Sequence, residues 1–397
     1  MMRRAAIGLS ALLTRRAWML TAGCLVLSSA LGQASGSDSI QHRRQFIAHR
    51  GVHLQSTLAG ENSLEAIRYA RRAGFSAIEM DVRLTADGHL VVMHDESLNR
   101  TCLNADGSSL ENVVPVALVP FAELRTKYVL KADARHDRVP VPTLKEYLQE
   151  CSKQGLLPFI EPKLYDASGN HYRDIIQLAD EAMGRGNYVI TSNNAANRVI
   201  RAIGMKDVRL MGILYQTTFE ELAGLGNTIM AISTSRFTAT EFASHAAHAI
   251  ALGIPIESHA DEYRRFAVID THPVDYVSTD LLAPDLTTDA AILARYNRWD
   301  DFRFNGQSRD GILKLTTHES LHLRNHLQQV FFGGVYLDLE MKGGFKVRLG
   351  KQEFSLNHPR MKRCRYQLLI YNAAPAFEII ATRSCDIRSI SLTLAAF

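Results

Sequence analysis

The chain has 397 residues, of which 46% are hydrophobic and 22% are charged. This is enough to bury the core of one barrel-sized domain together with a smaller second domain. The formal net charge is +4, and four of the positive charges lie in the first 34 residues, which contain no acidic residue. The rest of the chain has 41 basic and 41 acidic residues, so composition gives no reason to expect a nucleic acid or an anionic membrane surface as a partner.

Residues 1–34 have the features of an export signal. Arg15 and Arg16 precede an apolar run over residues 17–31, and small residues follow it. The run has about the length of a signal-peptide core and is too short to span a bilayer. The arginine pair resembles a twin-arginine signal, and cleavage after Ala34 fits the preference for small residues. We therefore expect an exported protein, periplasmic or secreted.

Export would place the four remaining cysteines, Cys102, Cys151, Cys364 and Cys385, in an oxidising compartment. Cys364 and Cys385 each precede a predicted strand, and the sequence is equally compatible with a disulfide between them and with two free thiols. Cys102 is predicted to be a buried thiol rather than a nucleophile.

An uncleaved anchor and lipidation of Cys24 are alternatives to cleavage of residues 1–34, although the apolar run continues past Cys24.

The stretch from residue 46 to residue 100 contains the first candidate site. A short apolar strand ends on His49, a capped helix is predicted over residues 64–73, and a second strand is predicted over residues 77–82. Alternation along that second strand points the side chains of Glu79 and Asp81 to the same side. Carboxylates and histidines at the ends of apolar strands are typical of the catalytic edge of α/β proteins.

Asp87 and Gly88 form a strong two-residue hairpin signal after this strand. If the turn closes the hairpin there, His94 on the returning arm lies opposite Asp81. A slip of one position on each arm places His94 opposite Glu79 instead. Either register predicts that a pair of carboxylates and a histidine share one face.

Two carboxylates on an apolar strand need a positive partner, because burying their charge alone is costly. A hard divalent cation is the simplest such partner. The alternative is a solvated strand on which Glu79 and Asp81 pair with Arg50 and Arg100.

The same stretch resembles the glycerophosphodiester phosphodiesterase family. Five motifs of that family occur here in order: an HRG, an E-N-[ST] helix start, an IExDV strand, a TxDG turn and a VVxHDxxLxRT strand. The resemblance is weaker but traceable over residues 142–284, and it does not extend to the first forty residues or the last hundred. It implies hydrolysis of a glycerophosphodiester to sn-glycerol 3-phosphate and an alcohol.

A third acidic strand follows at residues 156–163, which read LLPFIEPK and match the family's IExK strand. Alternation points Glu161 and Lys163 to the same side. Glu161 completes a set of three carboxylates with Glu79 and Asp81, and Lys163 offers a positive charge for a phosphate.

Strands and helices alternate from here to residue 296, which predicts eight parallel strands and a (β/α)₈ TIM barrel over residues 42–297. The last predicted helix of this series is 288–296. The arm that ends in His94 is too close to the preceding strand for a parallel crossover, so it is predicted to be the returning arm of a hairpin.

Residues 95–142 form a polar insertion with one short predicted helix, 121–127. In the resembled family such an insertion shapes the substrate pocket.

The later barrel motifs depart from the family. Its usual W-T-V-N segment, whose tryptophan lines the pocket, is replaced by Ile256, Glu257, Ser258 and His259. His259 either compensates for the tryptophan or is an ordinary surface histidine, and the second interpretation is slightly favoured. The family's closing T-D segment is matched by residues 278–280.

Residues 300–397 change to period-two alternation typical of antiparallel strands. Gly343 and Gly344 are predicted to turn the chain between two of about six strands, which indicates a small β-sandwich domain. Packing against the barrel and binding of a carbohydrate or envelope polymer are equally compatible roles for it.

These observations predict a metal-dependent phosphodiesterase. Glu79, Asp81 and Glu161 are expected to hold one divalent ion, Ca²⁺ or Mg²⁺. The expected phosphate-binding residues are Arg50 and Lys163. Glu61 is expected either to be a further ligand or to orient Arg50. His49 and His94 suit general acid and base, because imidazole titrates near neutral pH.

Two other functions remain open. One is a related barrel enzyme that cleaves lyso- or sphingo-phospholipids and forms a cyclic phosphate, for which an apolar pocket lip would be needed. The other is a non-catalytic envelope-binding protein, against which the complete set of site residues argues.

Overall fold

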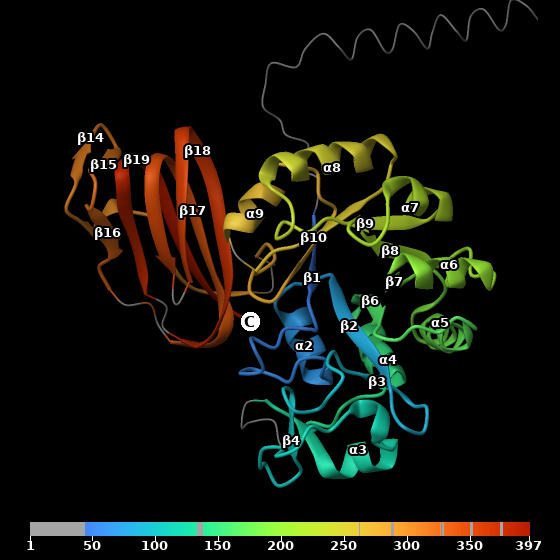
Figure 1. The fold of residues 1–397 in the computed structure, drawn as a ribbon. Coiled ribbons are helices and arrows are strands. Elements are labelled where there is room, and N and C mark those ends of the chain that lie inside the picture. Colours follow the sequence, from blue (N-terminus) through green and yellow to red (C-terminus); the bar gives the residue numbers. More distant parts are fainter. Residues whose placement is uncertain are drawn as a thin grey trace, which may run out of the picture. The chain divides into compact units, whose positions relative to one another are not determined.

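The computed structural model describes residues 44–397, apart from 133–137, 262, 287–289, 326, 328, 350–351 and 374–375 (Figure 1). The predicted export signal at residues 1–34 lies outside the described residues. None of the helices in the described part of the chain is long and apolar enough to cross a membrane.

Eight parallel strands form a closed barrel. Around the barrel they are β1 (Gln45–Ala48), β2 (Ala77–Leu84), β6 (Leu157–Pro162), β7 (Val189–Thr191), β8 (Arg209–Ile213), β9 (Thr228–Ala231), β10 (Ile256–His259) and β11 (Tyr276–Thr279). The barrel closes because β1 pairs with β2 on one edge and with β11 on the other. The predicted TIM barrel is confirmed.

Helices connect these strands. They are α2 (Leu64–Arg72), α4 (Leu144–Gln154), α5 (Asn170–Met183), α6 (Asn194–Ala202), α7 (Phe219–Leu225), α8 (Ala239–Ala251) and α9 (Tyr263–Ile269). Local sequence sets several of their starts. Thr143, for example, accepts a hydrogen bond from the Glu146 amide, and the Glu146 carboxylate accepts from the Thr143 amide, which is a complete capping box.

The inside of the barrel is a packed apolar layer at the amino-terminal side of the strands. It contains Ile47, Ala77, Phe159, Val189, Met211, Ile229, Ala231 and Tyr276. Strand alternation then points the next inward residues, two positions on, into the opposite end of the barrel. His49 follows Ile47 in this way, Glu79 follows Ala77, and Glu161 follows Phe159. The apolar layer therefore forms the floor of a polar site.

The hairpin after β2 has a different register from the predicted one. β3 (Leu90–Val92) pairs antiparallel with β2, with Val82 opposite Val92, and the Met93 amide donates to the Asp81 carbonyl. His94 therefore lies opposite neither Asp81 nor Glu79. The predicted two-residue turn is wrong. The Thr85 amide donates to the His89 carbonyl, so the loop consists of residues 86–88 rather than of two residues.

The insertion has a small core of its own. It contains β4 (Cys102–Asn104), η1 (Val116–Leu118), α3 (Phe121–Lys127) and β5 (Tyr128–Leu130), and β4 pairs with β5. The predicted helix 121–127 is confirmed. Cys102 is fully buried in this core, and burial raises the pKa of its thiol to about 12, as expected of a buried structural thiol rather than a nucleophile.

The C-terminal part is an antiparallel sheet. Its strands are β12 (Ala291–Tyr296), β13 (Phe302–Phe304), β14 (Gln307–Arg309), β15 (Ile312–Leu315), β16 (Ser320–Leu323), β17 (Val330–Leu349), β18 (Gln352–Ala373) and β19 (Phe377–Ala396), with the short helix η2 (Trp299–Asp301) after β12. The antiparallel β-rich region is confirmed, and these strands belong to one hydrogen-bonded sheet.

Two local predictions in this part were wrong. The helix predicted over 288–296 is strand β12 from Ala291 onward, because this segment pairs with the end of β19. Gly343 and Gly344 do not turn the chain. They lie within β17 at a shift of register, and Gly343 has a φ of 100° that favours glycine at such a bulge.

The possible disulfide between Cys364 and Cys385 is absent, and both cysteines are free. Cys364 lies on β18 and Cys385 on β19, and β17 runs between these two strands. Strands two places apart are about 9.5 Å from each other, which exceeds the roughly 7 Å that a disulfide can bridge between Cα atoms.

Among the described residues no helix follows β11, and the C-terminal sheet covers the barrel at this place. After β11, Leu282 forms a bridge to Leu368 of β18, and the Leu369 amide donates to the Leu281 carbonyl. Phe332 of β17 packs edge-on against Tyr69 of α2, with ring centroids 5.1 Å apart. β18 also contacts α9. The sheet thus covers the barrel between α9 and α2, where a helix following β11 would lie.

Phe332→Ala should therefore lower the free energy of unfolding by about 3–5 kcal/mol, because Phe332 is fully buried at this contact. Urea denaturation measures the change. Leu293→Ala, at an exposed position of β12, is the control and should stay within about 0.5 kcal/mol of the unmodified protein. Equal stability of the two variants would mean that the sheet does not support the barrel.

Candidate active site

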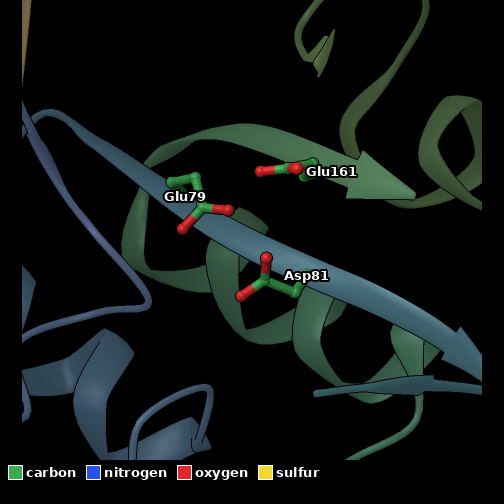
Figure 2. Close-up of side chains that lie close together, drawn as sticks. All are labelled: Glu79, Asp81 and Glu161. Carbon is green, nitrogen blue, oxygen red and sulfur yellow. The ribbon is translucent and has the colours of Figure 1, made fainter. Parts of the chain in front are cut away.

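Glu79, Asp81 and Glu161 meet at the carboxyl end of the barrel. Asp81 on β2 is the register partner of Glu161 on β6, and Glu79 lies two residues before Asp81 (Figure 2). Each of the three offers an oxygen atom within 4.8 Å of the others. Glu79 and Asp81 are buried, and Glu161 is partly exposed. The set predicted as metal ligands is therefore assembled in space.

Two cations offset part of this charge. Lys163 Nζ lies 2.6 Å from Glu161 Oε1 and 3.2 Å from Asp81 Oδ1, and Arg50 Nε lies 3.4 Å from Asp81 Oδ2. Burial alone would raise the pKa of Asp81, but Lys163 and Arg50 outweigh it and the pKa is lowered. Asn62 adds a hydrogen bond of 3.0 Å to Asp81 Oδ2.

Glu79 is the least compensated of the three. Burial raises its pKa well above the ordinary value, and the neighbouring charges of Asp81 and Glu161 raise it further. Its Oε2 accepts from the Arg50 backbone amide at 3.0 Å, but its Oε1 is buried with no hydrogen-bond partner in the described part of the chain. An orphaned carboxylate oxygen beside two further carboxylates fits a divalent cation.

The HRG turn after β1 brings Arg50 to this site. Arg50 and Gly51 both have left-handed backbone angles, with φ of 57° and 80°. A Cβ atom on Gly51 would lie 2.6 Å from the Cβ of Ala66 on α2, so only glycine fits against the helix. The tight turn points the Arg50 amide at Glu79 and its guanidinium at Asp81.

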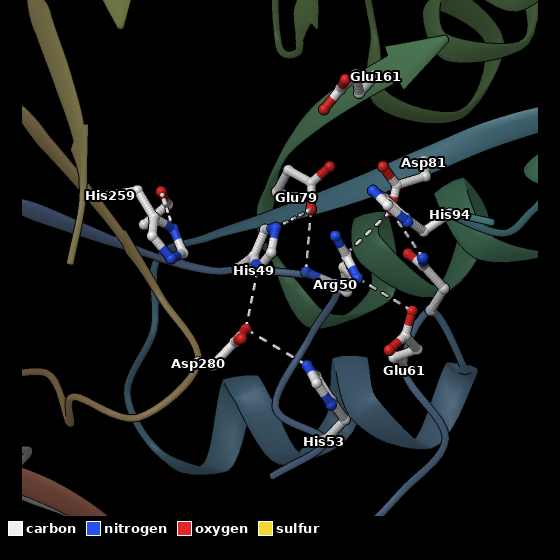
Figure 3. A network of polar contacts seen from close by, with 12 residues as sticks. His49, Arg50, His53, Glu61, Glu79, Asp81, His94, Glu161, His259 and Asp280 are labelled. Carbon is white, nitrogen blue, oxygen red and sulfur yellow. Dashed lines mark hydrogen bonds and ion pairs between the residues drawn. The ribbon is translucent and has the colours of Figure 1, made fainter. Parts of the chain in front are cut away.

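His49 lies beside Glu79 and is held by Asp280. Its Nδ1 is 2.9 Å from Asp280 Oδ1, and its Nε2 is 3.9 Å from Glu79 Oε2 (Figure 3). His53 Nε2 approaches the same Asp280 oxygen at 3.4 Å. Burial would raise the pKa of Asp280, but the two imidazoles outweigh it and hold it well below its usual range. An ionised Asp280 can therefore accept the Nδ1 proton of His49.

His94 has an equivalent partner. Its Nδ1 is 2.7 Å from Asp95 Oδ1, and Arg100 binds the same carboxylate through Nε and Nη2. Hydrogen bonds from Arg100 and His94 lower the pKa of Asp95 despite its partial burial. Arg100 also makes two contacts, of 2.6 and 2.7 Å, to Glu61, which lies 3.3 Å from Arg50. Glu61 thus lies between two arginines and outside the group of three carboxylates.

His259 is not the ordinary surface histidine that was favoured from the sequence. Its ring packs edge-on against His49, with centroids 4.9 Å apart. Its Nε2 is 2.7 Å from Asp261 Oδ2, and its Nδ1 is 3.1 Å from the Ser278 hydroxyl, which donates to Glu257. Burial lowers the pKa of His259, but Asp261 outweighs it and the pKa is raised. This segment supplies a polar wall next to His49.

The sequence-predicted residues gather as expected, with His49 and His94 on either side of the Glu79–Asp81 pair (Figure 3). Sequence reasoning assigned no role in the site to Asp280, Asp95 or His53, and it gave Asn62 only as an alternative to Ser63 for the cap of α2, which Ser63 provides. Asp95 follows His94 directly, and Asp280 closes the last barrel strand, so both stood in recognisable motifs. His53 had no signal, because its partner is 227 positions away in the chain.

Comparison with known proteins agrees with this geometry. Residues 49–206 match the sequence model of the glycerophosphoryl diester phosphodiesterase family. The chain is 34% identical over 146 residues to glycerophosphodiester phosphodiesterase 1 of Mus musculus, which covers 36% of this chain and 42% of the mouse protein. It is 49% identical over 157 residues to a glycerophosphodiester phosphodiesterase of Caldanaerobacter subterraneus, covering 34% of this chain and 62% of that protein.

The chain thus spans less than two thirds of the length of these curated relatives. A crystal structure from Silicibacter pomeroyi that bears the same family name superposes with a TM-score of 0.51 at 23% sequence identity. The match covers 60% of this chain and 90% of that one, and it supports the barrel fold.

The raised pKa of Glu79 predicts how stability depends on pH in protein stripped of divalent ions. Native Glu79 keeps its proton above the ordinary pKa of 4.5, whereas the unfolded chain releases it, so this group's contribution to stability falls as pH rises above 4.5. Glu79→Gln should therefore be the more stable protein near neutral pH, with a difference that shrinks as the pH falls towards 4.5.

Urea unfolding in excess chelator at several pH values measures this difference. Glu150→Gln is the contrasting variant, because Arg68 and Gln154 outweigh burial and lower the pKa of Glu150. A Glu79→Gln variant less stable than the unmodified protein at neutral pH would show that Arg50 and Lys163 compensate Glu79 fully.

Proposed function

We propose, on the premise that residues 49–206 belong to the glycerophosphoryl diester phosphodiesterase family, that this protein hydrolyses glycerophosphodiesters to sn-glycerol 3-phosphate and an alcohol. One observation carries the proposal. Three clustered carboxylates and two cations lie between His49 and His94, and the Nδ1 atom of each histidine is hydrogen-bonded to an aspartate. This is an arrangement for binding a phosphate and moving protons on both sides of it.

Glu79, Asp81 and Glu161 would hold one divalent cation, Ca²⁺ or Mg²⁺. All three offer oxygen, the ligand type that these hard cations prefer, and Glu79 Oε1 has no other described partner. When bound, the cation would supply positive charge for a phosphoryl oxygen.

Arg50 and Lys163 would bind the phosphate next to this group. Both are partly buried and both already contact Asp81, so their positions are fixed before substrate arrives. Glu61 would hold Arg50 in place rather than bind metal, because Arg100 and Arg50 occupy its two oxygens.

His49 and His94 would act as acid and base. When Nδ1 donates its proton to an ionised aspartate, Nε2 of the neutral imidazole is free to accept a proton. In the charged imidazole, Nε2 carries a proton that it can donate. Asp280 and Asp95 provide this for His49 and His94 respectively. Each histidine can therefore take either role, and the two can exchange roles between steps.

The proposed reaction has two steps. The glyceryl hydroxyl next to the ester is tethered, so it has a proximity advantage over bulk water. It gives its proton to one histidine and attacks phosphorus, while the other histidine protonates the departing alcohol oxygen. A cyclic phosphate results. Water then attacks phosphorus with the proton transfers reversed, and the ring opens to sn-glycerol 3-phosphate.

Metal dependence follows from the three carboxylates. Excess chelator should abolish the release of glycerol 3-phosphate from glycerophosphodiesters, and Ca²⁺ or Mg²⁺ should restore it. Glu79→Gln and Asp81→Asn should raise the metal concentration needed for half-maximal activity by about 10-fold or more. Full activity in chelator would contradict the assignment of this site.

His49→Ala and His94→Ala should each lower the rate by about 10²–10⁴-fold with the fold intact, as expected for lost acid–base catalysis. His272→Ala, at a histidine of the loop before β11, is the matched control and should retain activity. Steady-state kinetics and circular dichroism test this. Activity in both site variants would refute the histidine roles.

The cyclic step has its own test. A substrate that lacks the glyceryl hydroxyl adjacent to the ester should be cleaved very slowly, because only bulk water remains as nucleophile. Phosphorus NMR of the normal reaction should show the cyclic phosphate before the final product. Normal turnover of the deoxy substrate would mean that water attacks directly.

Export of the chain remains a prediction.

A further inference from the structure

Asp261 lies two residues after β10, and its carboxylate connects that loop to the end of β11. Its Oδ1 accepts from the Asp280 backbone amide at 2.7 Å and from the Thr279 hydroxyl at 3.4 Å, and its Oδ2 lies 2.7 Å from His259 Nε2. Burial would raise the pKa of Asp261, but the hydrogen bond and the charge of His259 outweigh it and the pKa is lowered. Both oxygens of an ionised Asp261 are therefore used within the protein.

His49 is bound to the same end of β11. Its backbone amide donates to the Thr279 carbonyl at 3.2 Å, and its Nδ1 lies 2.9 Å from Asp280 Oδ1. Two successive residues thus fix the backbone and the imidazole of His49, and Asp261 binds both of them. This is the first of two routes by which Asp261 acts on His49.

The second route is the ring of His259. It packs edge-on against the His49 ring, with centroids 4.9 Å apart (Figure 3). His259 Nδ1 lies 3.1 Å from Ser278 Oγ, which donates to the buried carboxylate of Glu257. Because Asp261 occupies Nε2 and Ser278 occupies Nδ1, neither ring nitrogen of His259 is available to a substrate. The ring is therefore a fixed surface beside His49 and not a proton-transfer group.

The His49 ring depends on these contacts, because it lies at the end of its strand. β1 ends at Ala48, and the left-handed turn at Arg50 and Gly51 takes the chain out of the sheet. The His49 side chain is 25% exposed, and its Nε2 lies 3.9 Å from Glu79 Oε2, which is beyond hydrogen-bond distance. A group that transfers protons must be held to within about 0.5 Å of its productive position.

The other histidine is held by a separate set of residues. His94 Nδ1 contacts Asp95, and Arg100 binds that carboxylate. None of the described contacts of Asp261 reaches these three residues. Loss of the Asp261 carboxylate should therefore disturb His49 and leave His94 in place.

We propose that Asp261 is a positioning residue for His49, which holds the imidazole through the Asp280 backbone and through the His259 ring. The inference rests on the proposed function and adds to it a residue outside the acid–base and metal-binding set.

Steady-state kinetics with divalent metal and a glycerophosphodiester give the first test. Asp261→Ala should lower kcat about 10–100-fold and change KM by less than about twofold, because a proton-transfer group is misplaced while the phosphate-binding residues stay. Asp261→Asn should recover most of this loss, since its Oδ1 can accept from the Asp280 amide and its NH₂ group can donate to neutral His259. Asp270→Ala is the matched control, because Asp270 contacts Arg44 just after α9, and it should keep the unmodified kcat.

His259→Ala removes only the second route. It should therefore lower kcat by a smaller factor than Asp261→Ala does. An unchanged kcat in either variant would overturn the inference.

Nitrogen-15 NMR of the imidazole groups tests the placement without any reaction, at one fixed pH and in protein stripped of divalent ions. The His49 spectrum should show a proton on Nδ1 that exchanges slowly with water. This signal should be lost or broadened in Asp261→Ala but not in Asp270→Ala, and the His94 signal should persist in both. His49→Gln and His94→Gln assign the two signals.

An intact His49 signal in Asp261→Ala would overturn the inference. Loss of the His94 signal together with the His49 signal would overturn it as well, because Asp261 would then support the whole fold rather than His49. If the unmodified protein cleaves no glycerophosphodiester, the proposed function fails, and the NMR signals still decide the inference.

Discussion

The repulsion among three carboxylates at the end of a closed barrel is the constraint on which the site depends. Glu79 and Asp81 are buried, and Glu161 stands beside Asp81 in the next strand. Burying such charges together is unfavourable unless positive groups approach them. The surrounding residues meet this need only in part, since Lys163 and Arg50 favour ionised Asp81 while Glu79 remains disposed to keep a proton. Because the neighbouring positive charge does not fully balance the three carboxylates, the cluster is suitable for a cation.

The same constraint explains how the rest of the site is arranged. Arg50 reaches the carboxylates through a left-handed turn that depends on Gly51, and Glu61 holds it from the other side. Glu61 is in turn bound by Arg100, which also fixes Asp95 against His94. A continuous chain of ion pairs therefore connects Arg50 to His94 through Arg100, a residue of the insertion. Rigid placement of this kind is what acid–base catalysis requires.

The C-terminal sheet contributes to the barrel rather than to the site. No helix follows β11 in the described part of the chain, and Leu368 of β18 forms a bridge to Leu282 just after β11. Phe332 then reaches α2, the helix that follows the HRG turn. By covering the barrel between α9 and α2, the sheet buries apolar side chains on the outside of the barrel, such as Tyr69 of α2.

The sequence by itself determined the barrel, the three carboxylates and the two histidines. Strand alternation and helix caps depend on neighbours within a few residues, so the placement of Glu79 and Asp81 and the capped helix over residues 64–73 could be predicted without a structure. It failed where a single residue of register mattered, as in the hairpin before His94. It also failed where a segment with helical composition is held as a strand by β19, as in β12.

Only the tertiary structure decided which distant residues meet. Closure of the barrel places β11 beside β1, and this brings Asp280 to His49 and His259 to the same wall. The order of strands in the C-terminal sheet keeps Cys364 and Cys385 apart, and the pairing of β10 with β11 brings Asp261 to the Asp280 amide. These outcomes depend on strand order and barrel closure, which bring distant segments together, as with His49 and Asp280, 231 positions apart. Periodicity along the chain specifies only which way each side chain faces.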